Sequence, residues 1–230
     1  MAGGGGIISV PAFMAVGLPP RMVLGTNKFA ATTGSFTSSI SYMKSGNCNF
    51  KLIKILAPFT LVGSVLGVKA ILLLDDSFLQ PLVLVLVLII GIYTFFSKTI
   101  GQSNEFNGLN KKNISLSIVL AFSLGFYDGF FGPGTGSFLI FGLIKILKID
   151  FLHASANSRI LNFISNISSL IIFGLSGNIN FRYGIPVAVF MIIGARLGTK
   201  VAINKGSKVI KPIFVTMSLA VALKLLIQLL

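Results

Sequence analysis

The chain has 230 residues, of which 54% are hydrophobic and only 10% are charged. A water-soluble domain carries about 25% charged residues, because its surface must face water. The composition and a mean hydropathy of +0.93 therefore indicate a polytopic membrane protein. They exclude a soluble enzyme, a disordered chain and a secreted disulfide scaffold. A single cysteine and a single histidine exclude an internal disulfide and a metal site built from several such residues.

The net charge of +14 comes from 19 lysines and arginines against 5 acidic residues. The basic residues interrupt apolar runs instead of gathering on one amphipathic face. That pattern is typical of cytoplasmic loops beside anionic lipid. The sequence therefore predicts a lipid bilayer as a partner and no nucleic acid, and it leaves the oligomeric state open.

Apolar segments follow one another along the chain, read as runs of about 17–25 apolar residues between polar breaks. The first is short and follows a glycine run. Another, in the second half, would be about 16 Å long as a helix, which is half a bilayer. The pattern predicts an all-α membrane protein with glycine-broken short segments near the midplane. In chain order the segments are 7–18, 27–43, 55–74, 81–96, 114–131, 137–147, 157–175, 183–201 and 209–230.

Two halves of the chain share sequence motifs. Residues 45–51 read Ser-Gly-Asn-Cys-Asn-Phe-Lys, and residues 176–182 read Ser-Gly-Asn-Ile-Asn-Phe-Arg, 131 positions later. The matches predict an internal duplication, with a first repeat over 1–97, a cytoplasmic linker over 98–113 and a second repeat over 114–230. Further matches pair Gly63 with Gly194 and Gly67 with Gly198 at 131, and Gly4 with Gly134, Gly6 with Gly136 and Asn27 with Asn157 at 130.

Each repeat holds about five segments, and an odd number of spans reverses the direction of the chain. The two repeats are therefore predicted to be inverted relative to one another. The second repeat has the span 114–131 before its glycine turn, whereas only three residues precede Gly4. We expect either that the initial helix of the first repeat lies upstream of Met1 or that it has been lost.

Lysines concentrate in alternate connections between the predicted spans. The positive-inside rule places such connections in the cytoplasm. Asp75 and Asp76, in an intervening connection, are then external. The cytoplasmic connections are those that contain Lys44, Lys51 and Lys54, then Lys98, Lys111 and Lys112, then Lys145 and Lys148, and finally Lys200, Lys205, Lys208 and Lys211.

Glycine turns that precede short helices are candidates for an anion site. Glycine lets the backbone bend and approach a ligand, and a helix that starts there points N–H groups and a positive dipole end at the turn. Glycine also serves close helix packing in membranes. We expect packing at Gly63, Gly67, Gly194 and Gly198, and an anion site at Gly4, Gly5, Gly6, Gly134 and Gly136.

Three stretches near the N-terminus read Gly3-Gly4-Gly5-Gly6-Ile7-Ile8-Ser9-Val10-Pro11, Gly17-Leu18-Pro19-Pro20 and Gly25-Thr26-Asn27-Lys28-Phe29, and a second glycine cluster covers 125–136. Together they resemble the sulfite exporter TauE/SafE family of membrane permeases, over essentially the whole chain. The resemblance implies transport of sulfite, organosulfonates or other sulfur-containing anions across the cytoplasmic membrane. The chain departs from the family by lacking the initial helix and by reading Gly-Pro-Gly-Thr-Gly at 132–136.

Lys28 and Arg159 follow the asparagines Asn27 and Asn157 near the starts of predicted spans. Sulfite and sulfonates carry several acceptor oxygens, which amide and cationic donors suit. A cation at the end of a span can instead extend to the interface. We expect both pairs, together with Thr26, to bind the anion and to approach each other near the glycine turns.

Asp128 is the one acid inside a predicted span, and it is either a proton relay that couples transport or a structural partner for Lys28, Arg159 or Arg196. No nucleotide-binding loop and no catalytic constellation appears in the sequence. The chain is therefore predicted to be a secondary permease for small sulfur-containing anions, with no enzymatic activity, cofactor or metal. The alternative is a truncated, non-transporting membrane protein or a structural partner of a membrane complex.

Overall fold

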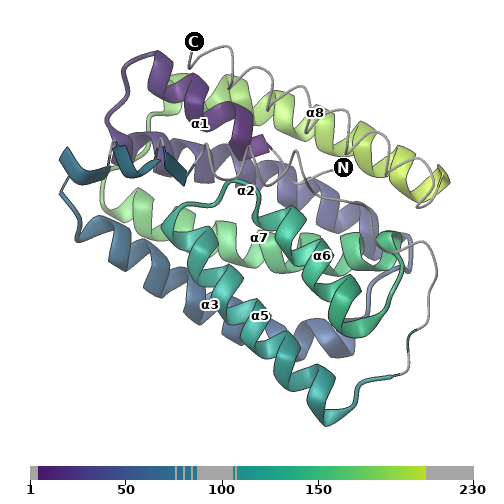
Figure 1. Ribbon diagram of the computed structural model, residues 1–230. Helices are drawn as coiled ribbons and strands as arrows, with labels where there is room; N and C mark the ends of the chain where they lie inside the picture. Colours follow the sequence, from purple (N-terminus) through teal and green to yellow (C-terminus); the bar gives the residue numbers. More distant parts are fainter. Residues whose placement is uncertain are drawn as a thin grey trace.

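The computed structural model describes residues 5–75, 77–79, 81–83, 85–86, 106 and 108–205. These residues form a bundle of α-helices and include no strand (Figure 1). Gly4, most of the expected segment 81–96, all of 209–230, and Asp76, Lys98, Lys208 and Lys211 lie outside them. The helices are α1 (Gly5–Ala15), α2 (Pro20–Lys44), α3 (Phe50–Leu72), α5 (Lys111–Phe130), α6 (Thr135–Leu147), α7 (Phe151–Leu175) and α8 (Phe181–Lys205).

Among the described residues, four helices are long and apolar enough to cross a membrane, namely α3, α5, α7 and α8. Two are short and apolar, namely α1 and α6. The expectation of an all-α polytopic membrane protein with short apolar helices is therefore confirmed.

Helix α2 has 25 residues but is rich in hydroxyl side chains. Thr32, Ser35, Thr37 and Ser38 each donate to the carbonyl oxygen four residues earlier, at 2.7–2.8 Å. Hydroxyls that bond to their own helix can enter an apolar interior at little cost. The helix begins at Pro20, so the predicted start of this span at Asn27 was too late.

Polar N-cap residues determine where three of the helices begin. The Asn49 side chain accepts from the backbone N–H of Leu52 at 3.0 Å, and the Asn110 side chain accepts from that of Asn113 at 2.8 Å. The Asp150 carboxylate accepts from two backbone N–H groups at the start of α7. These caps satisfy donors that a helix start leaves free. Helices α3 and α7 consequently begin about one turn or more before the predicted spans.

Helices α3 and α5 lie side by side (Figure 1) and approach each other closely through four glycines. A Cβ added at Gly63 or Gly67 would lie 2.3 or 2.1 Å from the carbonyl oxygens of Phe122 or Phe126. Gly125 and Gly129 make the reciprocal approach to backbone carbonyls of α3. The packing role expected for Gly63 and Gly67 is therefore confirmed. An added Cβ at Gly194 would meet no heavy atom within 4 Å, so the expected close packing is not found there among the described residues.

The contacts between helices of the two halves are reciprocal. Helix α2 runs parallel to α8, since Thr26 contacts Gly184 and Gly34 contacts Met191. Helix α3 runs parallel to α7, since Asn49 bonds to Asn157 and Ser64 to Ser168. An inverted duplication would produce this arrangement, because each α2–α8 contact is then matched by an α7–α3 contact. The duplication itself, and the repeat and linker boundaries, stay predictions.

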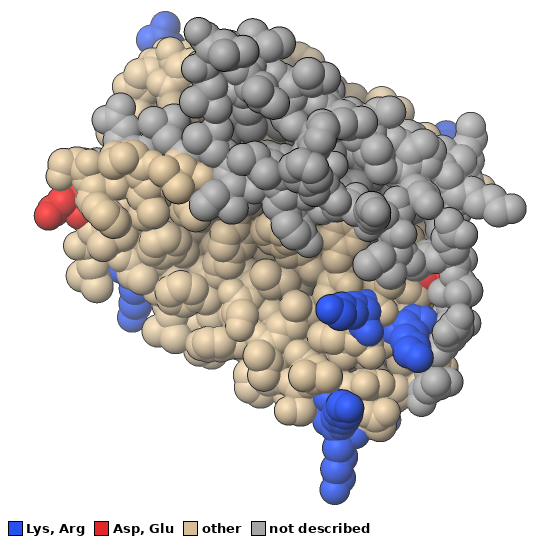
Figure 2. All heavy atoms as spheres, viewed as in Figure 1, with Lys and Arg blue, Asp and Glu red and all other residues tan. Residues whose placement is uncertain are grey.

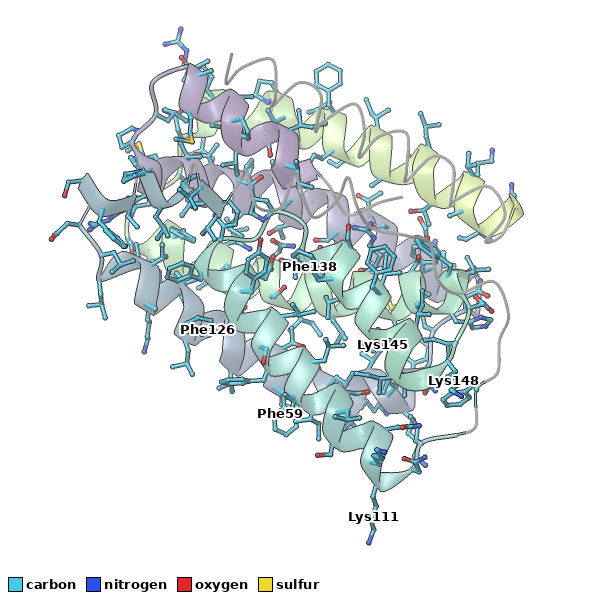
Figure 3. The ribbon with its side chains drawn as sticks, in the orientation of Figure 1. Phe59, Lys111, Phe126, Phe138, Lys145 and Lys148 are labelled. Atoms are coloured by element: carbon cyan, nitrogen blue, oxygen red, sulfur yellow. The ribbon has the colours of Figure 1, made fainter. Side chains whose placement is uncertain are left out.

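Basic side chains gather at one end of the bundle, where α5 begins and α6 ends (Figure 2). Lys111, Lys145 and Lys148 project outward at that end (Figure 3). The side surface between the two ends is largely uncharged, as a lipid-facing surface must be. The assignment of the lysine-rich end to the cytoplasm stays a prediction.

Candidate functional site

The connection between α5 and α6 is a tight turn that only glycine suits at two positions. Gly132 and Gly134 have φ angles of 101° and 84°, which disfavour residues with a Cβ. The Tyr127 hydroxyl donates to the carbonyl oxygen of Pro133 at 2.6 Å, and the Thr135 hydroxyl donates to that of Gly132 at 2.7 Å. Gly134 is also the N-cap residue of α6. The turn is thus held rigidly at the start of a short helix.

The start of α1 meets the same turn. A Cβ added at Gly6 would lie 3.2 Å from Pro133 and 3.3 Å from the Asn27 side-chain nitrogen. The Ser9 hydroxyl donates to the Asn27 side-chain oxygen at 2.6 Å, which orients the amide. Two short helices therefore start next to one another, and the positive ends of both helix dipoles lie at one place.

Lys28 of α2 and Asp128 of α5 form a buried ion pair beside this turn. Lys28 Nζ lies 3.0 Å from Asp128 Oδ1, and each side chain is only 1% exposed. Lys28 Nζ also donates to Asn166 Oδ1 at 3.3 Å, and the Ser165 hydroxyl donates to Asp128 Oδ2 at 2.5 Å. Lys28 therefore does not extend to the membrane interface, and that alternative is wrong for this residue.

The Lys28 ammonium group lies directly against the glycine turn. A Cβ added at Gly132 would be 2.8 Å from Lys28 Nζ and 3.3 Å from Asp128 Oδ1. Only a residue without a side chain lets the ammonium group approach the backbone this closely. The expected association of Asn27 and Lys28 with the turn at 132–136 is thus present in the structure. Gly4 falls outside the described residues.

The ion pair lies between two separate apolar clusters along the helices. One cluster includes Val23 and Leu24 of α2 and Phe173 of α7. The other includes Tyr42 of α2 and Leu161 of α7. Lys28 follows the first cluster and precedes the second along α2. The polar network is therefore enclosed by apolar layers on both sides, which places it at membrane depth.

Arg159 does not lie near Lys28. Helices α2 and α7 are antiparallel, because Lys28 bonds to Asn166 while Tyr42 interacts electrostatically with Arg159. Along α7, seven residues separate Asn166 from Arg159, or about 10 Å of helix. The expectation that Asn27 and Lys28 approach Asn157 and Arg159 is therefore wrong. It failed because Lys28 and Arg159 each lie about two turns into two antiparallel helices, so their positions are offset along the pair.

Thr26 and Asn157 make matching bonds to the opposite half of the chain. The Thr26 hydroxyl accepts from the backbone N–H of Asn180 at 2.9 Å, and the Asn157 side-chain oxygen accepts from that of Asn49 at 2.9 Å. Asn157 also donates to the His153 carbonyl oxygen at 2.7 Å. These bonds join helix ends of the two halves, and the ligand role expected for Thr26 and Asn157 stays a prediction.

The offset of 131 residues also pairs Thr26 with Asn157, which the comparison of the two halves did not use. Thr26 and Asn157 are 131 positions apart, as are Asn49 and Asn180. At this offset Lys28 corresponds to Arg159, whereas the offset of 130 had paired Asn27 with Asn157. Ser9, Ser165 and Asn166 were also missed as members of the site. For Ser165 and Asn166 the available signal was a polar patch inside an otherwise apolar span.

Arg196 lies away from Asp128. It lines a hollow at the far ends of α2 and α8, together with Ser41, Leu197, Lys200, Ile203 and Asn204. The partner of Asp128 is Lys28, so the option of pairing with Arg159 or Arg196 is excluded. Within the described part of the chain, no group of three or more His, Cys, Asp or Glu side chains could hold a metal ion.

Comparison with known proteins shows relatives that span almost the whole chain. The family model for the sulfite exporter TauE/SafE matches residues 1–225. A "Probable membrane transporter protein" of Haemophilus influenzae is 34% identical, covering 98% of this chain and 88% of the relative. The Sinorhizobium sp. protein "Probable membrane transporter protein ORF9" is also 34% identical, covering 98% and 86%.

A third relative is "Probable membrane transporter protein YfcA" of Escherichia coli K12. It is 31% identical, covering 98% of this chain and 83% of the relative. No solved structure matches the chain. On the family match and these relatives, the chain belongs to the TauE/SafE family of membrane transporters.

Proposed function

We propose that the protein is a secondary permease of the cytoplasmic membrane for small sulfur-containing anions such as sulfite or an organosulfonate. One observation carries the proposal: the buried Lys28 ammonium group lies against the turn at which two short helices begin. A cation in a membrane interior is costly and occurs mainly where it serves a substrate path or a partner. Here it adjoins a polar turn that is suited to an anion.

The donors around the turn match the chemistry of a sulfur oxyanion. Such a group presents several acceptor oxygens around one sulfur atom. The Lys28 ammonium group and the Asn27 amide can donate from α2, and backbone N–H groups at Gly134 and Gly136 can donate from the start of α6. The dipoles of α1 and α6 add positive potential without a further side chain. The family's description as a sulfite exporter agrees with this substrate class.

The helix pairing suits alternating access. Helices α2 and α8 form one parallel pair and α3 and α7 form another, with α2 and α7 antiparallel between them. Rocking of one pair against the other would expose the Lys28 region first to one side of the membrane and then to the other. The backbone bonds of Thr26 and Asn157 hold each pair together at one end, so each pair can move as a unit.

A flux assay tests this function. The purified protein is placed in proteoliposomes, and uptake of radiolabelled sulfite, isethionate, thiosulfate and sulfate is followed. We expect saturable uptake of at least one anion above protein-free liposomes, and competition by other members of the panel. Folded protein that moves none of these anions would favour the alternative, a non-transporting membrane protein.

A further inference from the structure

The positive charge that an anion needs at this site is already matched by a carboxylate. Lys28 Nζ lies 3.0 Å from Asp128 Oδ1 and both side chains are fully buried. An anion that binds to Lys28 while Asp128 is ionised would place two negative charges around one cation, in surroundings that screen charge poorly. Anion and carboxylate therefore compete for the same ammonium group.

We propose that the anion binds only when Asp128 takes up a proton, so that the protein carries one proton with each anion in the same direction. The inference rests on the proposed function. In the empty protein, the Asp128 carboxylate neutralises Lys28. A proton from water bonds to a carboxylate oxygen and makes a neutral carboxylic acid, which frees Lys28 to pair with the anion. For a monoanion the proton and the anion cancel, so the loaded site has the same charge as the empty one.

The hydrogen bonds around Asp128 can serve both protonation states. The Ser165 hydroxyl lies 2.5 Å from Asp128 Oδ2 and 3.1 Å from the carbonyl oxygen of Asn162. Its proton can point to the carboxylate when Asp128 is ionised. When Asp128 is protonated, the hydroxyl can donate to Asn162 instead and accept the new O–H bond. No buried donor or acceptor is then left without a partner, which would otherwise be costly.

Asn166 provides the matching support for Lys28. Its side-chain nitrogen donates to the Asn162 carbonyl oxygen at 2.7 Å, and this orients its oxygen toward Lys28 Nζ at 3.3 Å. Lys28 therefore keeps one neutral acceptor when Asp128 releases it. The ammonium group stays at the glycine turn in both states, ready for an anion.

The titratable groups that interact with Asp128 come from two helices. Lys28 faces it from α2, and Tyr127, its neighbour in α5, lies within electrostatic range. Helix α7 contributes the neutral side chains of Ser165 and Asn166, and α3 contributes its backbone at Ser64, against Gly129. The Tyr127 hydroxyl already donates to the Pro133 carbonyl oxygen. Asp128 is thus the group placed to take up the proton.

Calorimetry on the whole detergent-solubilised protein tests the coupling. Isethionate and thiosulfate serve as probes, because neither anion changes its charge between about pH 5 and pH 9. Titrations in buffers of different ionisation enthalpy give the number of protons taken up. Where Asp128 is ionised, we expect about one proton per bound anion, and affinity should fall about tenfold for each further pH unit. Anion binding without proton uptake overturns the proposal and leaves the proposed function intact.

Asp128→Asn mimics the protonated acid and sharpens the test. This variant should bind the probes with an affinity that does not change with pH, and without proton uptake. The control Asp75→Asn changes an exposed carboxylate and should behave as wild type. If Asp128→Asn does not fold, the number of protons that the wild type takes up per bound anion still tests the coupling. Absence of binding of both probes at every pH, in wild type and Asp128→Asn, contradicts the proposed function together with the coupling.

Discussion

Lys28 in α2 and Arg159 in α7 occupy equivalent positions of the predicted duplication, 131 residues apart, but their surroundings differ. Lys28 contacts a carboxylate from α5 and the turn that follows it. Arg159 is also buried, at 8% exposed, and lies within electrostatic range of Tyr42, farther along α2. One position thus holds a cation with an acidic partner at a glycine turn, and the other a cation beside a phenol.

The surroundings of Lys28 differ from those of Arg159 because of helix α5. This helix provides both Asp128 and, through Gly125 and Gly129, the close backbone contact with α3. Gly194 of α8, the predicted counterpart of Gly63 in α3, has no heavy atom within 4 Å of an added Cβ among the described residues. The Lys28 position thus combines a buried ion pair with a glycine turn. We infer that transport chemistry is concentrated at Lys28, and that Arg159 has a secondary role.

The largest expected effect comes from removing the two cations separately. Lys28→Ala leaves the buried Asp128 carboxylate without its cation, which costs about 3–5 kcal/mol of stability. It also removes a charge-assisted bond to the anion, so affinity should fall about tenfold to a hundredfold. Arg159→Ala should reduce anion uptake less. Proteoliposome uptake and thermal unfolding of both variants measure the difference.

The double variant Lys28→Ala/Asp128→Ala separates folding from binding. It removes both members of the pair, so it should regain much of the stability that Lys28→Ala loses. It should still transport poorly, because the ammonium group is absent. Equal loss of uptake in Arg159→Ala and Lys28→Ala would contradict the comparison between the two positions.

A smaller effect is expected at the glycine turn. Gly132→Ala places a Cβ 2.8 Å from Lys28 Nζ at a φ of 101°. Gly177→Ala has a similar positive φ, 69°, but open space around the added Cβ. Both variants incur backbone strain of about 1–2 kcal/mol, and only Gly132→Ala displaces the ammonium group. Anion affinity should fall in Gly132→Ala alone, and matched losses in both would exclude a specific role for the turn.

The two bonds between the halves should contribute nearly equally to stability. Thr26→Val and Asn157→Leu each remove an acceptor for the backbone N–H group at the end of a helix. The loss of such a bond costs about 1 kcal/mol. Thermal unfolding should show similar drops for the two variants, and Thr26→Ser should restore most of the first. An unchanged melting temperature in Thr26→Val would show that the bond between Thr26 and Asn180 does not contribute to stability.

The smallest effect is expected at Cys48, in the connection between α2 and α3. Burial raises the pKa of the Cys48 thiol to about 11. Because the thiolate is the reactive form, alkylation at neutral pH should be slow and should accelerate about tenfold per pH unit up to that value. Mass spectrometry of maleimide-treated protein measures the rate. Fast labelling of Cys48 at pH 7 would show that the thiol is more exposed to solvent than it is in the structure.

Composition and hydrophobic runs predicted the membrane class and the described helices, because a span must be apolar over a fixed length. They placed the starts of α2, α3 and α7 too late, because polar or charged residues in the first turns of these helices, such as Arg21, Lys51 and His153, look like loop residues in a sequence. The association of Asn27 and Lys28 with the turn at 132–136 was predictable from the glycine pattern. The pairing of Lys28 with Asp128 was one of several options, since only three-dimensional packing selects the partner.

The position of Arg159 could not be predicted from the motifs, because equivalent residues of inverted repeats need not meet. They approach each other only if they lie near the axis that relates the repeats. Lys28 lies beside Asn166 and Arg159 beside Tyr42, so both are displaced from the middle of the α2–α7 pair. The register between these helices depends on packing throughout the bundle, which no local motif encodes.

Anomalous diffraction from crystals soaked with selenate, a heavy analogue of the sulfur oxyanions, can show whether the anion binds at Lys28. The experiment is best done at acidic pH, where Asp128 can release Lys28. We expect a selenium peak beside the Gly132–Gly136 turn, with an oxygen about 2.7–2.9 Å from Lys28 Nζ. A peak at Arg159, or in the hollow lined by Arg196 and Lys200, with none at Lys28, would contradict it.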